Sequence, residues 1–135
     1  MRGQVPSQPS MYALVSPDDY VPKSHPIRQV KQVADACLRS LEPQFAAMYA
    51  QTGRASVPPE RLLKGSLLMA LFSVRSERQL CEQIHYNLMF RWFLDMDLTE
   101  QAFDATTFCK NRERLMQHEA ARAFSSCADI GAARE

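Results

Sequence analysis

The segment PPERLLKGSLLMALF, residues 58–72, limits the possible fold more than any other stretch of this chain. Pro58 and Pro59 suit the first turn of a helix, where a missing N–H group costs no hydrogen bond. The apolar residues that follow surround most of the helix circumference: Leu62, Leu63, Leu67, Leu68, Met69, Leu71 and Phe72. A helix that is apolar on most sides must be covered on most sides. The sequence therefore predicts a central helix with other elements packed around it.

The segments before this helix also have helical periodicity. After Pro26, apolar residues recur at steps of three and four through 27–41, the period of one buried helical stripe. A shorter segment with the same pattern starts at Pro43 and ends at Gly53. No segment alternates apolar and polar residues for long enough to predict a strand. The expected fold class is all-α, a helical bundle.

Further helices are expected after the central one. Ser76 and Gln79 have the spacing of a capping box and predict a helix start that turns Leu80, Cys81 and Ile84 inward. The run YNLMFRWFL, residues 86–94, is so apolar that the rest of the protein or a partner must cover it. The acidic stretch 95–104 has the composition of a loop, and a last amphipathic piece runs from about 119 to Gly131.

Prolines dominate the start of the chain, at positions 6, 9, 17, 22 and 26. Proline fixes φ and removes a hydrogen-bond donor, so residues 1–25 are expected to form an extended arm. Its apolar side chains are numerous enough to lie across a helical body: Tyr12, Leu14, Val15 and Tyr20.

Charge and cysteine content exclude several classes of protein. The 16 Lys and Arg residues nearly balance 15 Asp and Glu residues, so any contact with DNA must be local. The four cysteines form no C-x-x-C pair and follow no secretory segment, which favours reduced thiols in the cytoplasm: Cys37, Cys81, Cys109 and Cys127. The longest apolar run, residues 67–72, is too short to cross a bilayer.

The segment DATTFCKNRERL, residues 104–115, carries the candidate binding residues. If Thr106 is the N-cap of a helix, one stripe is polar and cationic, and the opposite stripe carries Phe108 and Leu115. The polar stripe consists of Thr107, Lys110, Asn111 and Arg114. Arg112 is expected to point toward the body and pair with an acid, and Glu113 to lie off the polar stripe.

Two interpretations of this helix compete. It is either an ordinary solvated surface helix or one whose polar side meets a nucleic acid. In the second case Lys110 and Arg114 suit phosphates or base edges, with Asn111 able to pair with adenine and Arg114 with guanine. Thr106 and Thr107 would suit a phosphate at the helix N-terminus. Arg75, Arg78 and Arg91 suit either neighbouring phosphates or solvent.

Metal and thiol chemistry are not expected. A zinc site can be drawn from Cys81, His85, Cys109 and His118, but their spacing matches no compact zinc signature, and buried structural cysteines fit better. Cys109 lies near a predicted helix N-terminus, yet no His or Asn is organised around it for nucleophilic catalysis. We therefore expect no catalytic residue, no metal ligand, no cofactor and no small-molecule substrate.

Several separated motifs resemble one known family. They are V-P-x-x-H-P-I-R near the start, P-P-E-x-L-L, S-E-R-Q-L, Y-N-L-x-F-R-W-F, and D-x-T-T-F-x-x-N-R-x-R-L. In this order and near this spacing they resemble the N-terminal domain of bacterial insertion-sequence transposases of the InsH-like type. The resemblance extends from Met1 to about Arg122.

The resemblance implies an all-helical module with a helix-turn-helix that recognises transposon-end DNA. It would precede an RNase-H-like DDE domain whose carboxylates hold two divalent metal ions. Residues 76–94 would then supply supporting helices and 106–116 the reading helix. This chain ends at ADIGAARE, before the family's first catalytic aspartate, so a truncated transposase is expected. Asp95, Asp97 and Asp104 are rejected as substitutes because they lie in a loop.

These inferences combine into one prediction. Residues 1–25 form the arm, 26–131 the helical DNA-binding domain and 132–135 a tail, and the catalytic domain is absent. The expected function is sequence-specific binding to the terminal inverted repeats of an insertion sequence, in the cytoplasm and without enzymatic activity. The expected partners are DNA and possible further transposase subunits, with no membrane. The alternative is a helical protein-interaction module that assembles transposase subunits with little DNA contact.

Overall fold

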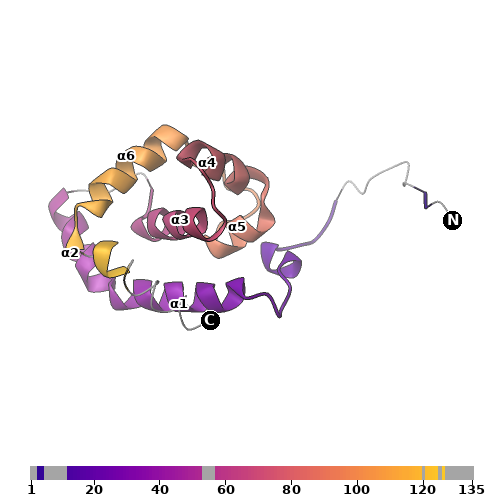
Figure 1. Ribbon diagram of the computed structural model, residues 1–135, viewed down its shortest axis with the longest axis horizontal. Coiled ribbons are helices and arrows are strands. Elements are labelled where there is room, and N and C mark those ends of the chain that lie inside the picture. The colour runs from indigo at the N-terminus through magenta and orange to yellow at the C-terminus, as the bar shows by residue number, and fades with distance from the viewer. Residues whose placement is uncertain (1–2, 5–11, 53–56, 120, 125, 127–135) are drawn as a thin grey trace.

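The computed structural model describes residues 3–4, 12–52, 57–119, 121–124 and 126, and it is helical, with no strand among these residues (Figure 1). The elements in order are η1 (Pro17–Tyr20), α1 (Ile27–Ser40), α2 (Glu42–Thr52), α3 (Pro59–Leu71), α4 (Glu77–Tyr86), α5 (Leu88–Phe93) and α6 (Ala105–Met116). This arrangement confirms the all-α class. No helix among the described residues has the length and apolarity needed to span a membrane. The predictions for residues 1–2 and 5–11 of the arm, for Gly53, for residues 120, 125 and 127–131 of the last amphipathic piece, which include Cys127, and for the 132–135 tail lie outside the described residues.

Helix α3 is central, as its composition predicts. Figure 1 shows it in the middle of the ring formed by the other helices. Leu62, Leu63 and Leu68 are buried on it. Gly65 lies where α6 crosses, and a Cβ at this position would stand 3.1 Å from the ring of Phe108. The glycine therefore lets α6 approach α3 closely.

Asparagine and serine caps divide the segment after α3 into two helices. Ser76 accepts a hydrogen bond from the backbone N–H of Gln79 at 3.2 Å, which confirms the predicted start of α4. In a capping box the Gln79 side chain would accept a hydrogen bond from the backbone N–H of Ser76. Here its oxygen accepts from the N–H of Arg75 instead, at 3.4 Å. Asn87 accepts from Met89 N–H at 3.0 Å and from Phe90 N–H at 3.3 Å, and so starts α5 within the apolar run.

The N-terminal segment touches the body through η1, not through the residues before it. Tyr12 and Leu14 are 89% and 104% exposed, and Figure 1 shows this part of the chain leading away from the helices. The expectation that these apolar side chains lie across the body is wrong in this structure. Instead η1 packs against α5, and Val21 after it is buried.

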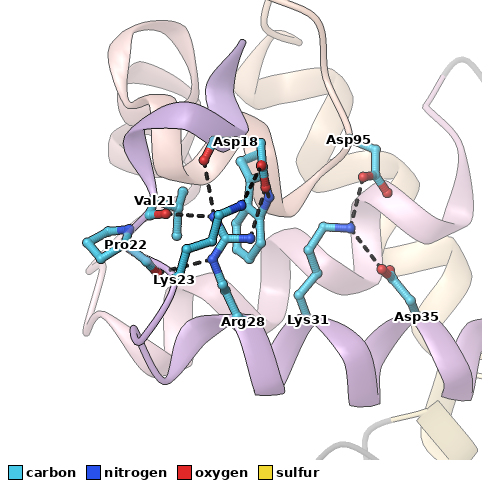
Figure 2. A network of polar contacts seen from close by, with 9 residues as sticks. Asp18, Val21, Pro22, Lys23, Arg28, Lys31, Asp35 and Asp95 are labelled. Atoms are coloured by element: carbon cyan, nitrogen blue, oxygen red, sulfur yellow. Dashed lines mark hydrogen bonds and ion pairs between the residues drawn. The ribbon is translucent and has the colours of Figure 1, made fainter.

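Arg28 of α1 holds η1 in place through four donated hydrogen bonds (Figure 2). Its guanidinium reaches the Asp18 carboxylate at 2.9 Å and the carbonyl oxygens of Asp18, Val21 and Pro22 at 3.1, 2.6 and 3.1 Å. The same group lies 5.0 Å from the ring centre of Trp92, whose Nε1 donates to Asp18 at 3.0 Å. Part of the apolar run 86–94 is thus shared with the N-terminal segment, as its aromatic content predicts.

This contact should be sensitive to acid. Hydrogen bonds from Arg28 and Lys23 lower the pKa of Asp18 below its usual value of 3.8. Because the pKa is lower in the folded state, the stabilisation is complete above the unfolded-state pKa and is lost as the pH falls through the folded-state value. Trp92 is the only tryptophan, so its fluorescence should stay constant down to about pH 4 and change below it. The same acid transition in Asp18→Asn would show that another group causes it.

A cluster of four charged residues fastens the end of α5 to α1 and α3, and Figure 2 shows three of them, Lys31, Asp35 and Asp95. Lys31 contacts Asp35 at 2.8 Å and Asp95 at 2.9 Å. Lys64 of α3 contacts Asp95 at 3.1 Å and also pairs with Asp35. Asp95 has a φ of 56°, in the left-handed region, so the chain turns sharply there. Lys64 is only 3% exposed and is neutralised at the edge of the core by two carboxylates that are themselves partly exposed.

The loop between α5 and α6 is held by two arginines. Arg91 of α5 is buried and donates to the carbonyl oxygens of Asp97 and Glu100, both at 2.7 Å, and of His85 at 3.2 Å. Arg61 of α3 pairs with the Glu100 carboxylate at 2.9 Å. Residues 94–104 are therefore irregular, as expected, but they are anchored at several points before α6 begins.

Candidate nucleic-acid interface

Helix α6 begins two residues earlier than the predicted cap at Thr106. Asp104 is the N-cap, and its carboxylate accepts a hydrogen bond from the backbone N–H of Thr107 at 3.3 Å. The prediction of Thr106 as N-cap is therefore wrong, because the aspartate two residues before it is an equally good cap and has the right backbone conformation. Asp104 also occupies one of the N–H donors that a phosphate at this helix end would use.

The buried side of α6 agrees with the prediction. Phe108 and Leu115 are 0% and 3% exposed and face the core. Phe108 stacks on Phe103, with ring centres 5.3 Å apart and planes at 8°. Helix α6 contacts both α3 and α4. The helix is thus seated firmly, with one defined side turned to solvent.

An ion pair between α4 and α6 fixes the rotation of α6. Arg112 donates to the Glu77 carboxylate at 2.8 Å, and both side chains are about one third exposed, at 31%. This confirms the expectation that Arg112 turns toward the body and pairs with an acid. Helices α4 and α6 are separated in the chain by α5 and residues 94–104, whereas a helix-turn-helix joins consecutive helices by a short turn. The helix-turn-helix stays a prediction.

The predicted polar stripe divides into an exposed and a half-buried part. Thr106, Lys110 and Arg114 are exposed, whereas Thr107 and Asn111 are half-buried. The amide of Asn111 donates to the carbonyl oxygen of Thr107 at 2.7 Å, which directs it along its own helix. Lys110 and Arg114 form no ion pair with any residue in the described part of the chain. Their charge is therefore available to a ligand.

The three arginines considered as flanking contacts differ in position. Arg75 is exposed in the turn between α3 and α4. Arg78 lies on α4 with its side chain 85% exposed, 3.8 Å from Glu82. Arg91 cannot meet a phosphate, because it is 4% exposed and its donors are bound to backbone carbonyls. Its location in an apolar run was the sequence signal for burial.

Glu113 is the one carboxylate of α6, and the structure exposes it beside the cations. Its carboxylate accepts a long hydrogen bond from the Cys109 thiol, at 3.8 Å. The prediction places it off the polar stripe, which holds for the stripe centred on Thr107. The exposed side of α6 does not coincide with that stripe, because Thr107 and Asn111 are half-buried. Glu113 therefore lies on the exposed side together with Lys110 and Arg114.

None of the three cysteines in the described part of the chain shows a sign of activation. Burial, helped by the charges of Asp104 and Glu77, raises the pKa of Cys81 to about 11. Burial and nearby Glu77 and Glu113 also raise the pKa of the Cys109 thiol. Cys37 is disulfide-bonded, so the expectation of a reduced thiol is wrong for this residue, whereas Cys81 and Cys109 are free. Within the described ranges, no group of three potential metal ligands converges.

The three loop aspartates each have a structural partner. Asp95 pairs with Lys31 and Lys64. Asp97 accepts from the N–H of Leu98 at 2.8 Å and from the hydroxyl of Thr99 at 3.0 Å. Asp104 caps α6. Sequence reasoning missed the contribution of Lys64 and Arg61 to this region, although a lysine within an apolar helix is a signal for a buried ion pair.

Comparison with protein-family models places residues 15–114 in one family, described as a transposase domain, DUF772. The matched range begins just before η1 and ends within α6 at Arg114. It includes the cations of α6 and the two arginines that hold the preceding loop. Neither the comparison with curated proteins nor that with solved structures gives a match.

Proposed function

The chain belongs to the transposase-domain family DUF772, and we propose that it binds the terminal inverted repeats of an insertion sequence through α6. In this proposal it is the non-catalytic N-terminal part of a DDE transposase of the InsH-like type, acting on DNA in the cytoplasm. The supporting observation is the pair Lys110 and Arg114, two exposed cations one turn apart that no described carboxylate neutralises.

The way α6 packs on the core, with its cationic side left exposed, supports a role in a DNA groove. The major groove of B-DNA admits one α-helix, provided that the helix protrudes with a polar, cationic side. Phe108 and Leu115 anchor the opposite side of α6 in the core. Lys110 would contact phosphates and Arg114 a guanine edge, while Arg75 and Arg78 extend the cationic surface. Because the net charge is only +1, attraction to DNA must come from this local group.

We also propose that this chain supplies recognition, not phosphodiester chemistry. A DDE transposase needs carboxylates that converge on two metal ions. The loop aspartates of this chain are instead engaged with lysines, with backbone N–H groups and with a helix N-terminus. The metal-binding carboxylates would come from a separate catalytic domain.

Replacing the two cations should have different effects on DNA binding. Arg114→Ala is expected to weaken binding to the preferred duplex by about 1–3 kcal/mol and to relax the choice of one base. Lys110→Ala should weaken binding to all duplexes alike and reduce the slope of log K against log salt by about 1. Fluorescence anisotropy at several salt concentrations, after selection of a preferred sequence from a random duplex library, measures both effects.

Arg39→Ala is the matched control. Arg39 is exposed on α1, which lies across the bundle from α6 in Figure 1, so its loss removes one positive charge away from the proposed interface. It should change affinity little. Equal affinities for wild type, Lys110→Ala and Arg114→Ala would remove α6 from the DNA interface.

The alternative, a protein-interaction module, has its own support. Tyr12, Leu14 and Tyr86 expose large apolar or aromatic side chains, at 89%, 104% and 68%. Apolar side chains exposed in this way are available for contact with another protein. Size-exclusion chromatography with light scattering separates the two functions: a monomer that forms a complex with the selected duplex supports DNA binding, and a dimer indifferent to DNA supports the alternative.

A further inference from the structure

We infer that Glu113 determines sequence specificity, by accepting a hydrogen bond from the amino group of a cytosine in the major groove. This inference rests on the proposed function, because it requires that α6 enters the groove. It adds a residue that the stripe of Thr107, Lys110, Asn111 and Arg114 does not contain.

The solvent-facing side of α6 is centred closer to Glu113 than that stripe suggests. Thr107 and Asn111 form one edge of the predicted polar stripe, and both are half-buried. The exposed polar side chains after the first turn are Lys110, Glu113, Arg114 and Gln117. At about 100° per residue, these four lie within roughly 100° of arc. A duplex that meets Lys110 and Arg114 therefore also meets Glu113.

The Glu113 carboxylate is open to a ligand. It forms no ion pair within the described part of the chain, whereas Glu77 on the facing helix is paired with Arg112 at 2.8 Å. The thiol of Cys109, 3.8 Å away, is a weak donor and does not satisfy the carboxylate. Glu113 also lines an open hollow of about 430 Å³ together with Glu77, Cys109, Arg112, Met116 and Gln117. An incoming donor therefore has room to approach.

The negative charge of Glu113 determines which DNA base it can contact. A carboxylate close to phosphates is repelled, and Lys110 and Arg114 on either side of it in sequence would draw the helix toward the DNA. The group that can satisfy a carboxylate in the major groove is an exocyclic amino group, and the cytosine N4 group is the usual partner of Glu and Asp. The O6 of guanine and the O4 of thymine are acceptors, so they would leave the carboxylate desolvated and without a donor. Adenine has an amino donor at N6, but its N7 acceptor lies beside it and would repel the carboxylate.

The test uses the full chain and a duplex library with a randomised central segment. Wild type should enrich cytosine at one position, with about 5- to 100-fold weaker binding when another base stands there. Glu113→Gln should change this preference to adenine, because glutamine pairs bidentately with the adenine N6 and N7 atoms. Anisotropy titrations with four duplexes that differ only at this position give the ratios. Glu113→Gln is a nearly isosteric change on the surface, and thermal unfolding should match wild type.

Glu82→Gln is the matched control, because it removes the same charge from an exposed position on α4. It should leave every base preference unchanged. If Glu113→Gln likewise keeps all wild-type preferences, and only raises the affinity for every duplex, the inference is wrong and the proposed function stands. If wild type enriches no sequence and Lys110→Ala binds as wild type does, both the proposed function and the inference fail.

Discussion

Arg91→Ala is expected to lower the free energy of unfolding by about 3–5 kcal/mol. The guanidinium is buried at 4% exposure and donates to three backbone carbonyls, of His85, Asp97 and Glu100. Alanine would leave these carbonyls without their donor and empty the volume of the side chain. Charge-assisted hydrogen bonds contribute more than neutral ones, and buried acceptors without a partner are costly. Urea denaturation followed by circular dichroism measures the change.

The matched control for this substitution is Arg78→Ala. Arg78 is 85% exposed and its contact with Glu82 is long, at 3.8 Å, so its loss should change stability by no more than about 0.5 kcal/mol. Amide hydrogen exchange adds a local measurement, since Arg91→Ala should increase exchange in residues 94–104 first. A destabilisation as small as that of Arg78→Ala would show that the three hydrogen bonds do not hold this loop.

Phe108→Ala should be similarly damaging, with a loss of about 3–5 kcal/mol. Phe108 has no exposed surface, stacks on Phe103 and fills the space above Gly65. Its truncation leaves a cavity between α3 and α6, which packed neighbours can close only in part. Because α6 is the proposed reading helix, DNA affinity should fall as well, even under conditions where the variant remains folded.

Phe72→Ala is the control for the loss of an aromatic ring. Phe72 also packs on another ring, with a distance of 5.4 Å to Phe90, but it is 40% exposed. Its truncation should cost clearly less than that of Phe108, since less apolar surface is involved. Thermal or urea unfolding of both variants gives the comparison, and equal losses would contradict the assigned role of Phe108 as the anchor of α6.

The orientation of several α6 side chains was predictable, because it depends on the spacing of residues within the helix. The inward side of α6, with Phe108 and Leu115, follows from helical periodicity. The turn of Arg112 toward an acid follows from its place on the same side. The identity of the cap did not follow, because Asp104 and Thr106 are both good N-cap residues and backbone conformation decides between them.

Other features depend on contacts between residues far apart in the sequence. Lys31 and Lys64 share Asp95, and Arg28 joins Asp18 to the ring of Trp92. Helical periodicity states which side of a helix is apolar, but it does not state which polar group of another helix will face a given charge. This is why Arg91 was considered for phosphate contact, although its donors are turned toward backbone carbonyls of the next loop.

The sequence by itself determined the all-α class, the central position of residues 59–71 and the inward sides of α1, α4 and α6, because these depend on periods and caps that lie within a few residues. Tertiary structure alone decided how far each side chain of α6 is exposed: Thr107 and Asn111 are half-buried, whereas Glu113 is exposed. Exposure depends on the packing of α6 against α3 and α4, and that packing is a property of the assembled bundle.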